Sequence, residues 1–347
     1  MIFQMEKLPS VKDLSVGQKT VLLRTNYDVP LKEGQVADGT RIDESLPTIN
    51  YLLGRQARVI LLSHLGRPEG KISPSLSLKP VAQYLSQLLK KEISLFAKTE
   101  EVDKGQPIVM LENLRFWPGE EANDLNFAQS LASLGDFFVN DAFACSHRQH
   151  ASIVGLPKLL PSAFGFDFLK EVEVLSEIKE KPYRPVTLIL GGAKKDKLEV
   201  IEKLLNWADK ILIGGKLPQW VSKSYPEKVI VAQLNPQGKD ITLESTNQFK
   251  EIISLSGTIL WAGPMGVFEE IENEEGTKQI AQAILASQAF KVVGGGDTEA
   301  ALTKFNLEAK IDFFVKQQTM FISSGGGAMF EFLAKGTLPG IEAIEQK

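Results

Sequence analysis

The second half of the chain carries four glycine clusters, and each of them comes directly after a short apolar run. The clusters are Gly191-Gly192, Gly214-Gly215, Gly294-Gly295-Gly296 and Gly325-Gly326-Gly327. Short apolar runs, turns and amphipathic helices also alternate through the first half. Several runs lack the alternation of a half-exposed strand, which is typical of parallel strands covered on both faces. The pattern therefore predicts an α/β fold with parallel, Rossmann-like sheets.

The apolar runs are interpreted as strands and the amphipathic stretches between them as helices. The predicted strands are 20–23, 59–62, 108–111, 137–139, 186–190, 211–213, 229–231, 258–261, 291–293 and 320–322. Helices are predicted over 170–180, 198–210 and 276–290. A further helix is expected to follow Ser45, which is placed to cap it with Pro47 in the first turn.

A length of 347 residues favours two domains over one. The predicted helix over 170–180 separates the two sets of strands, and Pro182 and Pro185 follow it. We therefore expect two doubly wound lobes joined by a helical hinge. The expected lobes span 1–168 and 183–332, with 169–182 as the connecting segment.

Composition excludes several classes of protein. A net charge of −4 argues against a nucleic-acid-binding protein, which usually has a basic excess. One cysteine excludes an internal disulfide and fits a reducing compartment. The chain shows no apolar core of a signal peptide and no apolar run of about 20 residues that could span a membrane. A soluble cytoplasmic α/β enzyme without nucleic-acid or membrane partners is expected.

The basic side chains are unevenly distributed. Seven of the eight arginines and all three histidines fall within the first 150 residues. Five of these arginines lie at strand ends or just before a helix: Arg24, Arg41, Arg67, Arg115 and Arg148. Ligands bind outside the carboxyl ends of strands in open α/β sheets, and arginine there suits carboxylate or phosphate. The first lobe is therefore predicted to bind a small anion.

The histidines and the cysteine are interpreted more plainly. His147 and His150 are three residues apart, but no carboxylate or Cys-x-x-Cys pattern supports a zinc site. We expect His64 and His147 to donate hydrogen bonds to the anion or simply to pack, and Cys145 to be structural.

The glycine motifs of the second half predict a phosphate site of a different kind. The chain has no G-x-x-x-x-G-K-[ST] motif, and Glu299 stands where a dinucleotide fingerprint needs glycine. In GGGDT, Asp297 could cap the next helix or hold a metal, and Thr298 could donate to a phosphate. In GGAKKDK, Lys194 and Lys197 follow a strand directly, where an ammonium group can reach a phosphate.

Taken together, these stretches resemble the phosphoglycerate kinase family over nearly the whole chain. The matching stretches are, in order, LLRTNYDVPL, DGTRIDESLPTINYLL, VILLSHLGRPEG, ENLRFWPGEEAND, VNDAFACSHRQHAS, GGAKKDK, ILWAGPMGVFEE, VVGGGDTEAAL and ISSGGGAMFEFL followed by LPGIEAI. The resemblance implies a monomeric, magnesium-dependent, hinge-bending enzyme. It would transfer the acyl phosphate of 1,3-bisphosphoglycerate to ADP, giving 3-phosphoglycerate and ATP.

The resemblance also implies roles for individual residues. The triose site falls on Asn26, Asp28, Arg41, His64, Arg67, Arg115 and Arg148. The nucleotide site falls on Gly192, Lys194, Lys197, Gly263, Glu269, Gly295, Gly296, Asp297 and Thr298, with Glu269 on the ribose and Asp297 on the metal. Lys194, Arg41 and Lys197 would stabilise the transferring phosphoryl group. The last segment, 333–347, is expected to return to the first lobe.

Four departures from the family pattern matter. RTNYDVP exchanges acid and amide, since Asn26 stands for an aspartate and Asp28 for an asparagine. GGAKKDK is one residue short, so Lys195 could serve instead of Lys197. Lys216 replaces a glycine, and Ala262 replaces an asparagine. A helix-length piece is missing between Gly215 and Trp261, where the family builds its adenine pocket.

Three hypotheses follow. The first is an active phosphoglycerate kinase with a trimmed nucleotide lobe, because the charged groups of the transfer site are all present. The second is a non-catalytic triose-phosphate-binding homologue that has lost productive nucleotide binding. The third, an NAD oxidoreductase, is disfavoured by the failed fingerprint.

Overall fold

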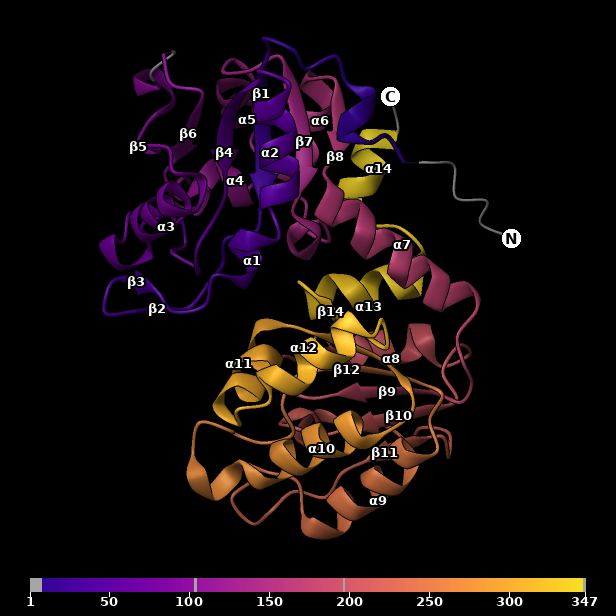
Figure 1. Ribbon diagram of the computed structural model, residues 1–347. Coiled ribbons are helices and arrows are strands. Elements are labelled where there is room, and N and C mark those ends of the chain that lie inside the picture. The colour runs from indigo at the N-terminus through magenta and orange to yellow at the C-terminus, as the bar shows by residue number, and fades with distance from the viewer. Residues whose placement is uncertain (1–7, 103–104, 196, 346–347) are drawn as a thin grey trace. The chain divides into compact units, whose positions relative to one another are not determined.

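The computed structural model describes residues 8–102, 105–195 and 197–345, which form two compact units (Figure 1). The first unit comprises Met1–Val172 and Thr337–Lys347, and the second comprises Glu173–Gly336. Helix α7 (Phe166–Glu180) runs from the first unit into the second.

The first unit contains a six-stranded sheet in the order β5-β6-β4-β1-β7-β8, in which every pair is parallel. Its strands are β1 (Thr20–Thr25), β4 (Arg58–Leu62), β5 (Ser94–Phe96), β6 (Ile108–Leu111), β7 (Phe137–Asp141) and β8 (Ser162–Phe164). Strands β2 (Leu31–Lys32) and β3 (Gln35–Val36) form a small antiparallel hairpin. The helices are α1 (Thr40–Asp43), α2 (Leu46–Gly54), α3 (Lys79–Leu89), α4 (Pro118–Glu121), α5 (Leu125–Ala132), α6 (Leu156–Leu159) and α14 (Pro339–Glu345), with a π-helical turn, η6, over Ala151–Gly155.

The C-terminal segment belongs to the first unit. Helix α14 packs on η6 and α6, and the N–H of Gly340 donates to the carbonyl of Ser146 at 2.9 Å. A Cβ at Gly340 would lie 2.8 Å from the Ser146 Cβ, so glycine is needed for this close approach.

The second unit contains another six-stranded parallel sheet, in the order β11-β10-β9-β12-β13-β14. Its strands are β9 (Val186–Leu190), β10 (Lys210–Ile213), β11 (Val229–Val231), β12 (Thr258–Ala262), β13 (Phe290–Gly294) and β14 (Met320–Ser323). The helices are α8 (Lys197–Leu204), α9 (Leu243–Ser254), α10 (Glu275–Ala286), α11 (Gly296–Lys304), α12 (Glu308–Lys316) and α13 (Gly326–Lys335). The predicted fold class, with two parallel Rossmann-like sheets, is confirmed.

The missing alternation in the strands has a direct cause in the core. Leu22 and Leu23 are neighbours in β1 and point to opposite faces of the sheet, yet both are fully buried. Leu188 and Ile189 of β9 are buried in the same way. Because each fully buried aliphatic side chain contributes about 1.5–3 kcal/mol, both faces of each sheet stabilise the fold.

Some local predictions were wrong. Ser45 does not cap α2 with its side chain, because its Oγ donates to the carbonyl of Ile42 at 2.7 Å and lies 2.8 Å from the Tyr27 hydroxyl. Its backbone is already helical, since α1 leads into α2. The helices predicted to end at residues 210 and 290 end earlier, at Leu204 and Ala286. Residues 210 and 290 are instead the first residues of strands β10 and β13.

Two carboxyl groups with raised pKa values lie at the start of α7, of which Asp141 is buried and Asp167 is half-buried. Asp141, at the end of β7, accepts a hydrogen bond from the N–H of Phe168 at 3.0 Å. Burial raises the pKa of Asp141 to about 6. Burial, with the nearby charges of Glu44 and Asp141, raises the pKa of Asp167 to about 8, and Lys170 opposes this shift. Since the folded protein holds these protons more tightly than the unfolded chain, stability falls as pH rises from about 4 towards 8.

We expect Asp141→Asn to increase stability at pH 7.5, because the amide keeps an acceptor oxygen and removes a buried charge. A pKa raised from 3.8 to about 6 corresponds to a gain of about 2–3 kcal/mol in the free energy of unfolding. Urea unfolding at pH 4 and pH 7.5 measures it, and the gain should vanish at pH 4. Asp312→Asn, an exposed site on α12, is the matched control. A gain of equal size at both pH values would contradict this account.

Candidate active site

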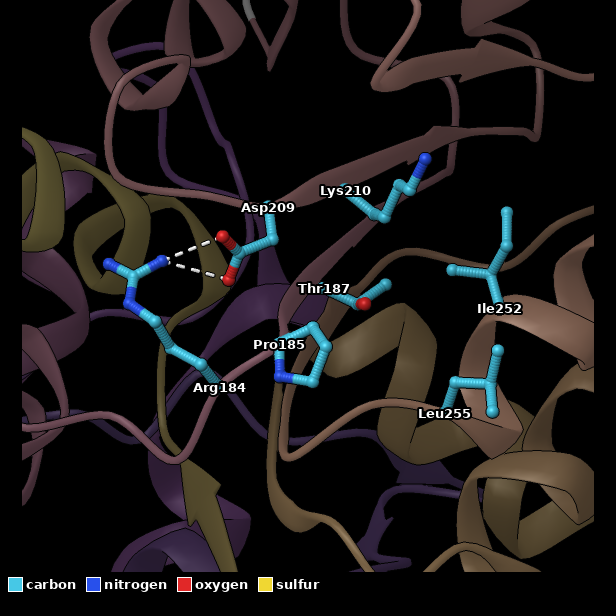
Figure 2. A pocket seen from close by; sticks show the side chains of 7 residues that line it. All are labelled: Arg184, Pro185, Thr187, Asp209, Lys210, Ile252 and Leu255. Carbon is cyan, nitrogen blue, oxygen red and sulfur yellow. Dashed lines mark hydrogen bonds and ion pairs between the residues drawn. The ribbon is translucent and has the colours of Figure 1, made fainter.

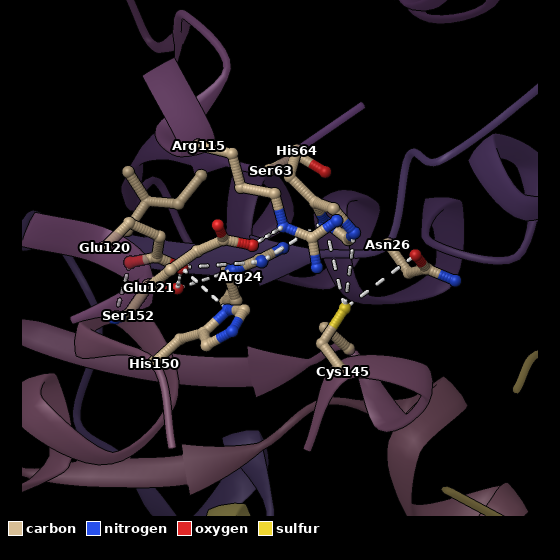
Figure 3. A network of polar contacts seen from close by, with 12 residues as sticks. Arg24, Asn26, Ser63, His64, Arg115, Glu120, Glu121, Cys145, His150 and Ser152 are labelled. Carbon is tan, nitrogen blue, oxygen red and sulfur yellow. Dashed lines mark hydrogen bonds and ion pairs between the residues drawn. The ribbon is translucent and has the colours of Figure 1, made fainter. Parts of the chain in front are cut away.

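Basic side chains gather at the carboxyl edge of the first sheet (Figure 3). Arg24 lies near the end of β1, His64 follows β4, Arg115 follows β6, and Arg148 follows β7. Arg24, His64 and Arg115 are at most 3% exposed. Arg148 is half-buried, with its Nε 3.4 Å from Nε2 of His147, and Arg67 is exposed. The edge therefore carries the concentrated positive charge that an anion site needs.

His64 is neutral in this environment. Burial lowers its pKa well below the usual value, and the charges of Arg115, Arg24 and Arg148 add to the effect. Arg24 donates to Nδ1 of His64 at 3.3 Å. The same cause, burial, lowers the pKa of His150 to about 3. These histidines can therefore donate hydrogen bonds to an anion but add no charge.

Asp28 holds the loop of Gly66 and accepts from one of the predicted arginines. Its Oδ1 accepts the N–H of Gly66 at 2.8 Å, and the carbonyl of Gly66 accepts Nη1 of Arg115 at 2.8 Å. Its own carbonyl accepts Nη1 of Arg41 at 2.6 Å. Gly66 has φ +63, and a Cβ there would also lie 2.7 Å from the side chain of Leu76. Asp28 thus fixes two of the predicted arginines.

Asn26 lies deeper than Asp28. It is 8% exposed, and its Nδ2 has no hydrogen-bond partner among the described residues. Its Oδ1 lies 3.9 Å from Sγ of Cys145, which also contacts His64. The exchanged pair therefore divides its work, with the acid bracing a loop and the amide leaving a donor beside the basic cluster.

Sequence reasoning placed Arg24 with the anion-binding arginines, but the structure buries it completely. Its Nε donates to Oγ of Ser152 at 2.8 Å, and its Nη2 lies 3.8 Å from Oε1 of Glu120. Neither Glu120 nor Ser152 was identified from sequence. The only signal was the acidic pair in PGEE, which is typical of the first turn of a helix.

Glycine turns at the carboxyl edge of the second sheet pack directly against one another. A Cβ at Gly191 would lie 2.3 Å from the carbonyl of Pro264, one at Gly215 would lie 2.4 Å from the nitrogen of Gly192, and one at Gly263 would lie 2.2 Å from the carbonyl of Gly191. Gly192, Gly215 and Gly263 also have positive φ. The clusters are therefore required for the backbone of three turns to meet.

Lys197 lies at this glycine edge, whereas Lys194 and Lys195 are exposed. The Nζ of Lys197 donates to the carbonyls of Gly191 at 2.8 Å and Ala262 at 3.2 Å. These carbonyls follow or end β9 and β12. The structure thus places the ammonium group of Lys197, rather than that of Lys195, at the strand ends.

The GGGDT segment forms the start of α11. Gly295, with φ +101, precedes the helix, and Gly296 and Asp297, which are both exposed, open it. The Thr298 hydroxyl is buried, accepts the N–H of Gly263 at 2.7 Å and donates to the carbonyl of Gly294 at 3.1 Å. Thr298 therefore braces the ends of β12 and β13. Glu269 is exposed in the loop after β12.

A hollow of about 460 Å³ lies at the opposite edge of the same sheet (Figure 2). Its lining residues are Arg184, Pro185, Thr187, Asp209, Lys210, Ile252 and Leu255. Arg184 and Asp209 form an ion pair at 2.8 Å. Because β9 and β10 begin here, the hollow is separate from the glycine turns.

Comparison with known proteins decides the family. The family model described as phosphoglycerate kinase matches residues 11–229 and 221–336. The chain belongs to the phosphoglycerate kinase family. A phosphoglycerate kinase of Finegoldia magna is 39% identical, with 97% of this chain and 99% of the relative covered, and one of Fervidobacterium nodosum is 39% identical over 99% of each.

Solved structures agree with this assignment. The phosphoglycerate kinase of Coxiella burnetii has a TM-score of 0.74 and 31% identity, with 98% of this chain and 99% of that chain covered. The enzyme of Pyrococcus horikoshii has a TM-score of 0.80 and 28% identity, with 97% and 98% covered. The predicted membership, and with it the assignment as a kinase, is confirmed.

The comparisons also show that this chain is shorter than its relatives. The alignment with the Finegoldia relative runs over 399 positions, whereas this chain has 347 residues. The relative therefore has segments that this chain lacks. The two matched regions overlap over residues 221–229, which lie inside the interval predicted to be trimmed.

The described residues lack two further kinds of feature. They contain no group of three or more His, Cys, Asp or Glu side chains able to hold a metal. No described helix is both long enough and apolar enough to cross a membrane.

We expect Asp28→Ala to weaken binding of 3-phosphoglycerate about tenfold, or about 1.4 kcal/mol, because the loss of a charged acceptor loosens the Gly66 loop and Arg115 with it. Asp28→Asn keeps an acceptor oxygen and should stay within about threefold of the parent protein. Calorimetric titration of the three proteins measures this, with ADP affinity as the internal control. Equal losses in both variants would show that charge, not bracing, is the contribution of Asp28.

Proposed function

We propose that this phosphoglycerate kinase family member reversibly transfers the acyl phosphate of 1,3-bisphosphoglycerate to ADP, giving 3-phosphoglycerate and ATP. The observation that carries the proposal is the pairing of two anion-binding sheet edges in one chain. One edge is built from guanidinium and imidazole groups, and the other from backbone turns and Lys197. Such a pair suits the transfer of a charged group between two anionic ligands.

On the triose side, Arg41, His64, Arg67, Arg115 and Arg148 would bind the carboxylate and phosphate ends, with Asn26 donating from its Nδ2. The rigid forks of Arg115 and Arg41 are already held by backbone carbonyls. Pre-organised arginines lose little freedom on binding, which favours affinity and orientation. Exposed Arg67 and half-buried Arg148 can turn towards a ligand as it arrives.

On the nucleotide side, Gly192 and Gly263 would allow a phosphate to approach the turns closely because they have no side chain, although their N–H groups already donate to the carbonyl of Pro264 and the hydroxyl of Thr298. The N–H groups open to phosphate would be those at the N-terminus of α11, at Gly295 and Gly296. Lys194 and Lys197 would supply positive charge to the phosphates. Glu269 would bind the ribose, as the family pattern implies. Thr298 would act mainly through the geometry it imposes, because its hydroxyl bonds already join two strand ends.

Asp297 fits a magnesium site shared with the nucleotide. Its exposed carboxylate stands at the first turn of α11, and magnesium is usually held by one or two carboxylates together with substrate phosphates. When bound, the ion would neutralise phosphate charge. The chain's own residues then orient the two substrates, and a carboxylate leaving group needs no general acid.

Movement about α7 would bring the two bound substrates in line and exclude water from the reaction. We assign the lobes as 1–168 with 333–347 and as 183–332, and 169–182 as the hinge. A monomer acting in the cytoplasm, with adenine nucleotide as the second substrate, completes the proposal.

A coupled assay of ATP formation from 1,3-bisphosphoglycerate and ADP tests the function, with magnesium present and after chelation. We expect turnover that depends on magnesium. Calorimetry with 3-phosphoglycerate is run on the same preparation. Triose binding without ATP formation would reject the kinase activity in favour of a non-catalytic binding protein.

We expect Lys194→Ala to lower kcat about a hundredfold, or about 3 kcal/mol in activation free energy, because it removes a positive charge that would stabilise the transferring phosphoryl group. The affinity for 3-phosphoglycerate should not change. Lys195→Ala removes an equally exposed charge one position away and is the matched control, with a change below about threefold. Similar losses in both variants would point to a general positive potential instead of a specific contact.

We also expect weak discrimination between nucleotide bases, because the segment expected to be missing between Gly215 and Trp261 belongs to the region that forms the adenine pocket in the family. The retained turns contact phosphate and ribose, which all nucleotides share. Values of kcat/KM for ADP, GDP and IDP measure this, and we expect them to lie within about tenfold. A preference for ADP of about a hundredfold, or about 2.7 kcal/mol, would show an intact base pocket.

A further inference from the structure

Four buried polar side chains form a chain of contacts that ends at His64 (Figure 3). Oγ of Ser152 donates to Oε1 of Glu120 at 2.5 Å, and the Ser152 N–H donates to the other carboxylate oxygen at 2.9 Å. Nε of Arg24 donates to Ser152 Oγ at 2.8 Å, and its Nη2 contacts Nδ1 of His64 at 3.3 Å. No member is more than 3% exposed.

The chemistry of these groups fixes the position of the proton in each hydrogen bond from Glu120 to His64. A carboxylate only accepts, so the hydroxyl of Ser152 must donate to Glu120. The oxygen of that hydroxyl is then the acceptor for Arg24. A guanidinium only donates, so Nδ1 of His64 must be the acceptor. The ring therefore carries its single proton on Nε2.

The surroundings of His64 favour this form. Burial and the nearby charges of Arg115, Arg24 and Arg148 lower the pKa of His64, so a second proton on the ring is strongly opposed. Its Nε2 lies 3.9 Å from Sγ of Cys145, and a thiol is a weak acceptor. The Nε2–H is thus available to a stronger acceptor, such as an oxygen of an anionic ligand.

We propose that Glu120 and Ser152 are positioning residues, which act through Arg24 to hold His64 as a neutral ring that donates from Nε2 to a substrate oxygen. Only the identity of that ligand, a three-carbon phosphate ester with a carboxylate, rests on the proposed function. Arg24 supplies order here instead of a direct contact. The contacts from Glu120 through Ser152 give it one orientation.

Nitrogen NMR of protein labelled at histidine tests the proton order without any substrate. The His64 signals are assigned by their loss in His64→Gln. We expect an unprotonated Nδ1 and a protonated Nε2 that do not change between pH 6 and pH 8. A protonated Nδ1, or a charged ring in this range, overturns the proposal, whatever reaction the protein catalyses.

Ser152→Ala then removes the hydroxyl that links Glu120 to Arg24, without changing the charge of the protein. We expect a measurable fraction of His64 to take its proton on Nδ1, and the Kd for 3-phosphoglycerate to rise at least fivefold while ADP affinity stays within twofold. Ser152→Thr keeps the hydroxyl and should restore the parent tautomer. Ser287→Ala, which removes another buried hydroxyl from the second unit, is the matched control.

The outcomes are separable. An unchanged His64 tautomer and an unchanged Kd for 3-phosphoglycerate in Ser152→Ala would contradict the positioning role of Ser152. The expected tautomers in a protein that binds no 3-phosphoglycerate would support the proton order and count against the proposed substrate. Should Ser152→Ala fail to fold, the wild-type spectrum alone still decides whether Nε2 carries the proton.

Discussion

Burial of positive charge at one sheet edge is the constraint that the first unit is built to satisfy. Arg24 and Arg115 are almost completely enclosed, and an uncompensated buried cation would cost several kcal/mol. Backbone carbonyls, Glu120 and Ser152 offset that cost. Because each compensating contact has a direction, the arginines are held in place before any ligand arrives. The contacts that offset the cost of burying the guanidinium groups also fix the orientation of these groups.

The second unit would also recognise an anion, at a sheet edge that holds little buried charge. Its glycine turns depend on the absence of Cβ atoms, since a side chain at Gly191, Gly215 or Gly263 would collide with backbone. Backbone N–H groups bind phosphate without the cost of burying a cation. Lys197 is half-buried at this edge, and its ammonium group is held by the carbonyls of Gly191 and Ala262. In the proposed function, the first unit would recognise anions with side chains and the second mainly with the N–H groups at the N-terminus of α11.

Sequence patterns predicted the strands well because strands depend on local composition, and they predicted the family because many motifs occur in the same order. Buried parallel strands are continuous apolar runs, and the motif order leaves little freedom in topology. Short strands such as β5 and β8 have too few residues for a pattern. Glu120 and Ser152 could not be found because they meet Arg24 only in the folded chain, 128 residues away in the case of Ser152. The failed cap at Ser45 has the same origin, since Tyr27 takes part in its hydrogen bonding.

The exchange of Asn26 and Asp28 illustrates how such contacts decide a substitution. Two unit charges 4 Å apart repel by about 4 kcal/mol at an effective dielectric near 20, so a carboxylate beside an anionic ligand would be costly. Here the carboxylate of Asp28 faces the N–H of Gly66 instead. The deeper position holds the neutral amide, whose Nδ2 has no partner among the described residues and can donate to an anion. The acid thus stands where it braces the loop of Gly66, and the amide stands beside the basic cluster with a donor that an anion can accept.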